Sequence, residues 1–79
     1  MKVVIAKVDQ VYFDGEAVSV TVPATEGEMT VLGNHEPFVT TLKPGVITVH
    51  AADLQDGQQF FEVTSGVLEI HPGGATIIL

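Results

Sequence analysis

The chain has 79 residues, which is enough for one hydrophobic core, and it has no cysteine; disulfide bonds and thiolate metal sites are therefore excluded. Ten acidic residues against three lysines and no arginine give a net charge of −7. A nucleic-acid binder needs basic residues to neutralise phosphates, and an anionic membrane surface would repel this charge, so we expect neither as a partner.

The first predicted element is a strand near residues 2–8, in which the apolar run Val3–Ala6 lies between Lys2 and Lys7. Four apolar residues are too few for a signal peptide or a membrane span, which need roughly 7–15 and about 20 respectively. We therefore expect the chain to stay in the compartment where it is made. The lack of cysteine fits a reducing, cytoplasmic setting.

Gly and Pro recur at short intervals along the rest of the chain, and such intervals leave room for strands but not for helices of ordinary length. The predicted strands lie near residues 2–8, 10–13, 16–22, 28–32, 38–42, 46–52, 58–65, 67–71 and 75–79. Many short strands at regular spacing typically close into a sandwich or flattened barrel, which hides the sheet edges. The predicted fold is one all-β sandwich domain over residues 1–79.

In three of these strands the side chains alternate, which is typical of a strand with one buried and one solvated face. One face is predicted to carry Val18, Val20 and Val22, then Ile47, Val49 and Ala51, then Leu68 and Ile70. The opposite face is predicted to carry Ala17, Ser19 and Thr21, then Val46, Thr48 and His50, then Glu69 and His71. Asp56-Gly57, after Leu54, is predicted to form a hairpin turn, because glycine accepts the positive φ that such turns require.

Three histidines are candidates for chemistry: His35, His50 and His71. None has the spacing of a metal-ligand pair, and the last two fall on the polar side of their strands. His35 lies in a loop beside Glu36, where the two side chains could act as an acid–base pair. Adjacent residues usually point apart, however, and no nucleophile or phosphate-binding motif accompanies them. We expect no catalytic residue, metal or cofactor.

Acidic residues cluster at Glu26-Gly27-Glu28, and Glu36 follows eight residues later. The alternating carboxylates of a calcium loop are present only in part. Two interpretations remain, a solvated turn or an acidic knob that meets a partner's basic residues. A lipoyl or biotinyl carrier domain would need a lysine at a hairpin tip, and Lys43, followed by Pro44-Gly45, has the wrong setting for one.

Six segments carry a family resemblance when they are read together. They are Phe13-Asp14-Gly15, Val20–Glu28, Val31-Leu32, His35-x-Pro37, Thr40-x-Leu42-Lys43-Pro44-Gly45 and Val63–Pro72. In this order and spacing they resemble the N-terminal domain of the epsilon subunit of F-type ATP synthases, along essentially the whole chain.

The resemblance implies a ten-stranded, flattened β-sandwich of two packed sheets at the foot of the central stalk of a rotary enzyme. The domain is then expected to dock on the gamma subunit and the c-ring at the cytoplasmic face of the membrane, without inserting into lipid, and to couple ion-driven rotation to ATP synthesis. The implied c-ring contacts are Glu26, Glu28 and Glu36, and the implied gamma contacts are Lys7, His35 and Thr40. We expect an apolar patch toward gamma and an acidic edge toward the ring.

The sequence departs from the family at Thr30, where glycine is usual, and at Gly33-Asn34, where Pro-Gly is usual. The family usually continues into a two-helix C-terminal domain; we expect that domain, with its ATP binding and its inhibition of hydrolysis, to be absent after strand 75–79. Two alternatives stay open. One is a free-standing interaction domain with a different partner, and the other is a small enzyme or metal protein that uses His35 and Glu36.

Overall fold

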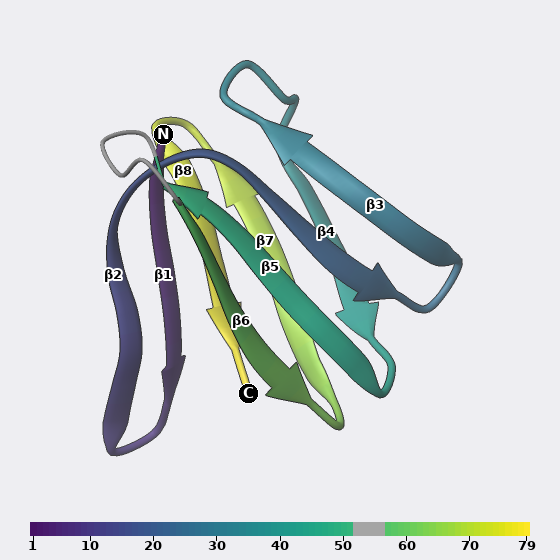
Figure 1. The fold of residues 1–79 in the computed structure, drawn as a ribbon. Coiled ribbons are helices and arrows are strands. Elements are labelled where there is room, and N and C mark those ends of the chain that lie inside the picture. Colours follow the sequence, from purple (N-terminus) through teal and green to yellow (C-terminus); the bar gives the residue numbers. More distant parts are fainter. Residues whose placement is uncertain (52–56) are drawn as a thin grey trace.

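The structure, a computed structural model, describes residues 1–51 and 57–79, and these residues form eight β-strands (Figure 1). The strands are β1 (Lys2–Lys7), β2 (Gln10–Ala24), β3 (Gly27–Leu32), β4 (Phe38–Leu42), β5 (Gly45–Ala51), β6 (Gln58–Val63), β7 (Gly66–His71) and β8 (Gly74–Ile78). Within the described ranges, no helix has the length and apolar character needed to cross a membrane. The all-β prediction is therefore confirmed.

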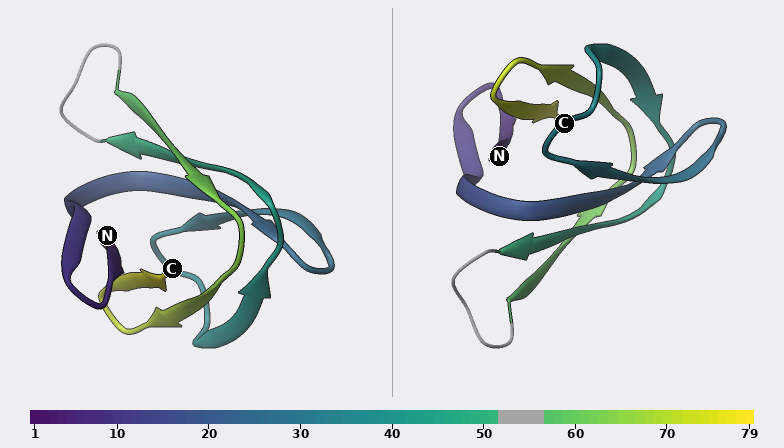
Figure 2. Two further views of the ribbon diagram at one scale, coloured as in Figure 1. Left: turned by 90° about the horizontal axis from the view of Figure 1, so that it is seen from below. Right: turned by 90° about the horizontal axis from the view of Figure 1, so that it is seen from above.

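The strands form two layers that share the long strand β2. The first part of β2 pairs with β1, which continues through β8 and β7 to β4; we call this set the β8 layer. The last part of β2 pairs with β3 on one side and with β5, followed by β6, on the other; we call this set the β5 layer. Seen along the strands, the layers enclose one interior (Figure 2).

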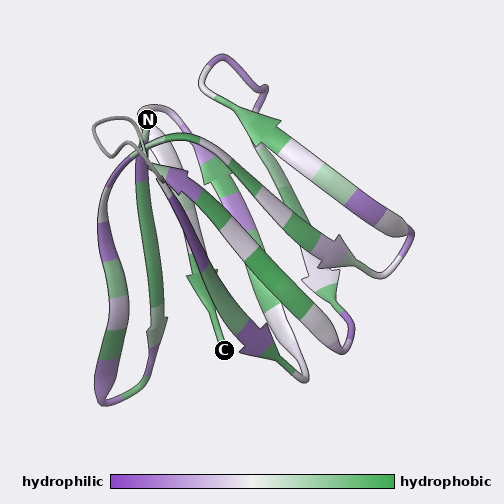
Figure 3. Cartoon of the chain, in the orientation of Figure 1, coloured by the Kyte–Doolittle hydropathy of each residue, from purple (hydrophilic) through white to green (hydrophobic). Residues whose placement is uncertain are grey.

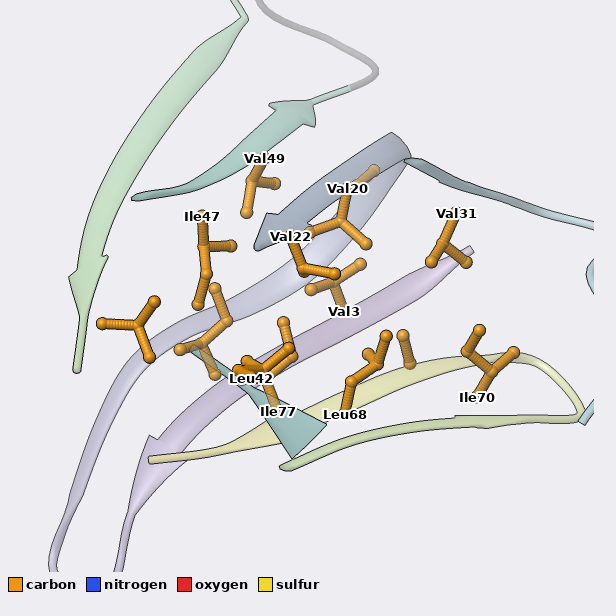
Figure 4. Packing of buried hydrophobic residues seen from close by; sticks show 14 of the residues in the cluster. Val3, Val20, Val22, Val31, Leu42, Ile47, Val49, Leu68, Ile70 and Ile77 are labelled. Atoms are coloured by element: carbon orange, nitrogen blue, oxygen red, sulfur yellow. The ribbon is translucent and has the colours of Figure 1, made fainter. Parts of the chain in front are cut away.

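The interior is filled by apolar side chains from both layers. Those that are fully buried include Val20, Val22, Val31, Ile47 and Val49 of the β5 layer and Val3, Ile5, Leu68, Ala75 and Ile77 of the β8 layer. The two sets point toward one another (Figure 4). No buried polar side chain is found among the described residues. Hydrophobic burial is thus the main source of stability for this small fold.

The ten strands implied by the resemblance are not found among the described residues, which form eight. The predicted strands 10–13 and 16–22 are one continuous strand, β2, of 15 residues. Gly15 does not interrupt it, because the glycine lies in register opposite Val3 of β1. A glycine between two β-branched runs is therefore a weak sign of a strand end in this chain.

Two of the three predicted alternations are confirmed, and the third is wrong at one end. In β5 and β7 the buried residues are those predicted to share a face. In β2, however, Val18 is 53% exposed, whereas Ala17 is buried together with Val20 and Val22. The register with β5 shifts between Ala17 and Ser19. A β-bulge of this kind inserts an extra residue and reverses the faces on one side of it.

The predicted turn at Asp56-Gly57 lies at the edge of a segment outside the described residues, since Leu54 and Asp56 fall within 52–56. Gly57 is described; its carbonyl oxygen accepts a hydrogen bond from the backbone N–H of Ala51.

Replacing Gly74 with alanine is expected to destabilise the fold by about 2–3 kcal/mol. A Cβ at this position would overlap the backbone carbonyl oxygen of Lys2 in the neighbouring strand β1, and a backbone atom cannot rotate away. The measurement is urea unfolding, in which the midpoint should fall at an unchanged slope.

The matched control is Gly15→Ala, because a Cβ there meets only the Phe13 ring at an ordinary distance of 3.5 Å. It should change the unfolding free energy by less than about 0.5 kcal/mol. Equal midpoints for the two variants would show that β1 and β8 do not approach as closely as described.

Candidate docking surfaces

In the β3–β4 loop, the hydrogen bond between His35 and Glu36 involves the Glu36 backbone and not its carboxylate. The Nδ1 atom of His35 lies 2.7 Å from the backbone carbonyl oxygen of Glu36, so the ring is engaged by a backbone acceptor. The ring also lies beside Phe38, with the ring centroids 6.0 Å apart. Among the described residues no group of three His, Asp or Glu side chains is placed to hold a metal ion.

The other two histidines have separate, ordinary settings. His50 is exposed on β5. The ring of His71 is half-buried, with Nδ1 at 3.1 Å from the Pro72 carbonyl oxygen and Nε2 at 3.0 Å from the Thr76 hydroxyl. Since a carbonyl only accepts, Nδ1–H donates to the Pro72 carbonyl oxygen, and Nε2 forms a hydrogen bond with the Thr76 hydroxyl. Both ring nitrogens are used within the fold, as in a structural histidine.

Residues Thr25–Glu28 form an acidic turn that joins β2 to β3. Ala24 pairs with Gly27 across it, so only Thr25 and Glu26 lie in the loop. Gly27 has a φ of +132°, a conformation that residues with a Cβ rarely adopt. The side chains of Glu26 and Glu28 are exposed, and the turn projects from the body of the molecule (Figure 2).

The acidic turn carries unpaired negative charge. Both ion pairs of the described residues lie elsewhere, between the N-terminal ammonium and Glu16 and between Lys2 and Asp14. The carboxylates of Glu26 and Glu28 are therefore available to basic residues of a partner.

Glu36 lies away from this turn. It follows the end of β3 at Leu32, whereas the acidic turn precedes the start of β3 at Gly27. Figure 1 shows the two connections at opposite ends of the strand. Five residue steps along a strand span about 16 Å, so the structure brings together two of the three acidic residues singled out in the sequence.

The three residues that the resemblance pairs with gamma are also spread out. Lys7 ends β1, His35 lies in the exposed β3–β4 loop, and Thr40 lies within β4. The Thr40 side chain is half-buried, and its strand partner is the fully buried Leu68, so it points toward the interior. The end of β1, which carries Lys7, and the β3–β4 loop, which carries His35, lie at opposite ends of the molecule (Figure 1).

A strip of mostly apolar residues crosses the outside of the β8 layer at the end of the sandwich where Lys7 lies. Successive cross-strand partners in this strip are Thr41, Val67, Ile78, Ala6 and Val11. Val67 is 40% exposed and Ile78 is 49% exposed. Partners that lie directly opposite share a face. Figure 3 shows β1 and the end of β8 coloured as hydrophobic.

A second row adds Val39 and Val4 to the same surface, interrupted by Glu69 and Thr76. We call these two rows the outer face of the β8 layer. An apolar patch toward gamma was predicted from the sequence, but the residues that form it were not. The signal was present in strands 38–42 and 75–79, where both alternating sets contain Val, Ile or Leu, so that Val39 and Ile78 lie on the side away from the buried set.

Lys7 also lines a groove at the end of the sandwich where β1, β6 and β8 terminate. Its volume is about 680 Å³, and Glu62, Val63, Thr64 and Leu79 line it as well. Besides Lys7 and Glu62, the lining includes the hydroxyl-bearing residues Thr64 and Ser65.

Thr30 occupies an ordinary strand position in β3, and its hydroxyl lies 2.8 Å from that of Thr21. Neither Gly33 nor Asn34 has a positive φ. The two departures from the family pattern therefore fit regular strand and turn geometry.

The described residues thus form a two-layer β-sandwich with exposed apolar residues on one outer face and a projecting acidic turn. The family described as "ATP synthase, Delta/Epsilon chain, beta-sandwich domain" matches residues 1–79. The chain belongs to this family, as its sequence motifs predicted.

Individual relatives agree with the family match. The chain is 44% identical over 70 residues to the ATP synthase epsilon chain of Sinorhizobium fredii, which covers 89% of this chain and 51% of the relative. It is 33% identical over 78 residues to the ATP synthase epsilon chain of Herminiimonas arsenicoxydans, covering 99% of this chain and 55% of the relative. The chain thus spans about half the length of these curated relatives.

Two solved structures share the fold. One is a chain of the Euglena gracilis mitochondrial ATP synthase, OSCP/F1/c-ring in rotational state 1, with a TM-score of 0.83 and 25% identity; the match covers 96% of this chain and 48% of that one. The other is a chain of the Tetrahymena thermophila mitochondrial ATP synthase central stalk/c-ring, with a TM-score of 0.79 and 18% identity, covering 99% and 61%. The sandwich prediction is therefore confirmed in its general form.

Replacing Gly27 with alanine is expected to destabilise the acidic turn by about 1–2 kcal/mol, because its φ of +132° places a Cβ in a strained conformation. Space is not the cause, since no atom lies within 4 Å of an added Cβ. Urea unfolding measures the effect.

Gly33→Ala is the control, because Gly33 also has open space around it but no positive φ. It should leave stability unchanged or raise it by up to about 1 kcal/mol. If both variants behaved alike, the described backbone of the acidic turn would be wrong.

Proposed function

We propose that this chain is the β-sandwich part of a rotor subunit of an F-type ATP synthase. In this role residues 1–79 act as one non-catalytic docking domain that joins the gamma subunit to the c-ring and couples ion-driven rotation to ATP synthesis. It would work at the cytoplasmic face of the membrane as a peripheral component, without a cofactor. The observation that carries the proposal is the family match over the whole chain. The Euglena neighbour, a chain of an assembly of OSCP, F1 and the c-ring, supports it.

The size of the molecule constrains how two large partners can bind. A standard interface covers about 800 Å² on each partner. Two such interfaces would occupy about a third of the 4850 Å² that this chain exposes. Simultaneous docking therefore requires two separate surfaces, and the chain has two of different character.

We assign the gamma subunit to the outer face of the β8 layer. An exposed apolar surface of several strands is unusual on a monomer and typically marks a protein interface. Lys7 and His35 lie near opposite ends of the molecule, whose longest extent is 29 Å. An elongated partner such as a long helix, at 1.5 Å per residue, would need about 20 residues to span that length. Such a partner could extend from Lys7 across the outer face toward His35.

Thr40 would act in this interface through its neighbours. Its hydroxyl lies 3.4 Å from the Thr41 carbonyl oxygen, and its half-buried side chain faces Leu68. The adjacent residues Val39 and Thr41 belong to the outer face. A substitution of Thr40 would therefore affect gamma binding indirectly, by shifting β4.

We assign the c-ring to the acidic turn. Glu26 and Glu28 project together from the end of the β2–β3 hairpin, and neither forms an ion pair among the described residues. Basic residues in the polar loops of a ring would find complementary charge there. Glu36, at the other end of β3, is proposed as a separate and weaker contact.

The strand count of ten stays a prediction from the resemblance. Because β2 serves both layers, counting its two parts separately raises the described count from eight to nine.

Glu28→Lys is expected to weaken binding to the c-ring, because it reverses the charge at the tip of the acidic turn. The loss should be larger at 20 mM than at 300 mM salt, since ions screen exposed charges over about 10 Å at 0.1 M. The measurement is the affinity of the chain for detergent-solubilised c-ring at both salt concentrations.

Asp9→Lys is the charge-matched control, because Asp9 lies in the β1–β2 turn, far from the acidic turn (Figure 1). It should weaken ring binding much less. If Glu28→Lys leaves ring binding unchanged at both salt concentrations, Glu28 does not contact the ring.

Val67→Lys is expected to weaken binding to gamma by about tenfold or more, because it places a charge at the centre of an apolar interface. The control is Val18→Lys, which adds the same charge at a 53% exposed valine on the β5 layer. Calorimetric titration with purified gamma measures both. Equal losses would indicate a non-specific effect of charge, and a larger loss for Val18→Lys would move the gamma site to the other layer.

A further inference from the structure

The acidic turn begins where the ends of β2 and β4 meet, at a short seam between the two layers (Figure 1). Across this seam the backbone N–H of Lys43 donates to the Pro23 carbonyl oxygen at 2.9 Å. Ala24 then pairs with Leu42. The N–H of Thr25 donates to the Thr41 carbonyl oxygen at 3.0 Å. The seam thus reaches the first residue of the acidic turn.

Two threonine hydroxyls extend the seam beyond its backbone hydrogen bonds. The Thr25 Oγ1 atom lies 2.8 Å from the Thr41 carbonyl oxygen and 2.6 Å from the Thr41 Oγ1 atom. Each hydroxyl has one hydrogen, and the carbonyl can only accept. Thr25 therefore donates to the carbonyl, and the Thr41 hydroxyl donates to Thr25 Oγ1. Both hydrogens are used, and the turn is joined to β4 by side chains as well as by the backbone.

The β2–β3 hairpin needs such a link, because β3 has β2 as its strand partner in the described sheet and no second one. A hairpin at the edge of a sheet that is hydrogen-bonded along only one side can bend relative to the rest of the sheet. The seam with β4 opposes this bending at the residue where the turn begins. Thr41 also belongs to the outer face of the β8 layer, where Val67 is its cross-strand partner.

We propose that the Thr25–Thr41 hydroxyl pair is a positioning link that fixes the acidic turn relative to the outer face of the β8 layer. This inference rests on the proposed function, in which those two surfaces dock on the c-ring and on gamma. The link keeps the carboxylates of Glu26 and Glu28 in one position while the body of the domain is held by gamma. Without the link the turn still forms, but it samples more orientations, and each ring contact then costs more conformational entropy.

The chain contains a matched control for this idea. Thr21 and Thr30 form a second hydroxyl pair at 2.8 Å, but both belong to the β2–β3 hairpin itself. Removing that pair deletes the same kind of hydrogen bond without disconnecting the hairpin from β4. A general effect of lost threonine hydrogen bonds would appear at both pairs, whereas a positioning effect would appear at one.

The test uses four variants. Thr25→Val and Thr41→Val each remove one hydroxyl of the pair at nearly constant volume, whereas Thr25→Ser keeps the hydroxyl at position 25. Thr21→Val is the control. Amide hydrogen exchange of residues 25–28 is measured in the free chain, and affinities for detergent-solubilised c-ring and for purified gamma are measured separately.

Loss of one modest hydrogen bond changes an equilibrium by about two- to tenfold. We expect exchange at 25–28 to rise and ring affinity to fall by that factor in both Thr25→Val and Thr41→Val. For Thr25→Val, gamma affinity should change by less than twofold. Thr25→Ser should have the same exchange at 25–28 and the same affinities as the unsubstituted chain, and Thr21→Val should leave ring affinity unchanged.

Several outcomes would overturn the link. Unchanged exchange in Thr25→Val and Thr41→Val would show that the hydroxyl pair does not hold the turn. Faster exchange with unchanged ring affinity would make the pair a purely structural feature. Equal losses in Thr21→Val would remove the special role of this pair.

The link and the proposed function can fail separately. If Glu28→Lys weakens ring binding while the threonine variants do not, the function stands and the link is wrong. If Glu28→Lys has no effect, the ring contact itself is wrong.

Discussion

The rest of the structure depends on the continuity of β2 through both layers. Its first part pairs with β1 and its last part with β3 and β5, and its end meets β4 at the Ala24–Leu42 seam. One strand therefore closes the interior on two sides. Because the backbone cannot slip by one residue without exposing Val20 and Val22, the register of β2 fixes the relative position of the layers.

This constraint explains how a chain of 79 residues can offer two docking surfaces in a fixed relation. The interior consists of close-packed aliphatic side chains, and such packing resists deformation. The outer face of the β8 layer and the acidic turn differ in chemistry, one apolar and the other negatively charged. In the proposed function, a domain of this kind would transmit force between two partners by being stiff, and this would need no reactive group. Binding would also stabilise a small domain by mass action.

Much of the fold could be predicted from the sequence, because the signals are local. Alternation in β5 and β7 identified the buried residues, and the glycine and proline positions excluded long helices. Val18 was misassigned because a bulge depends on how β2 pairs with β5, which no local pattern records. The separation of Glu28 from Glu36 was already implied by the predicted strand 28–32, since the first begins that strand and the second follows its end. The Thr25–Thr41 pair joins residues 16 positions apart, so only the folded chain shows it.

The central claim is that gamma and the c-ring bind separate surfaces of one rigid domain at the same time. The most direct measurement is the affinity of the chain for detergent-solubilised c-ring, with and without saturating gamma. We expect gamma to leave the affinity for the c-ring unchanged or to raise it. We also expect a complex of all three components to be recovered by size-exclusion chromatography. Displacement of the ring by gamma would contradict it, because the two partners would then share one surface.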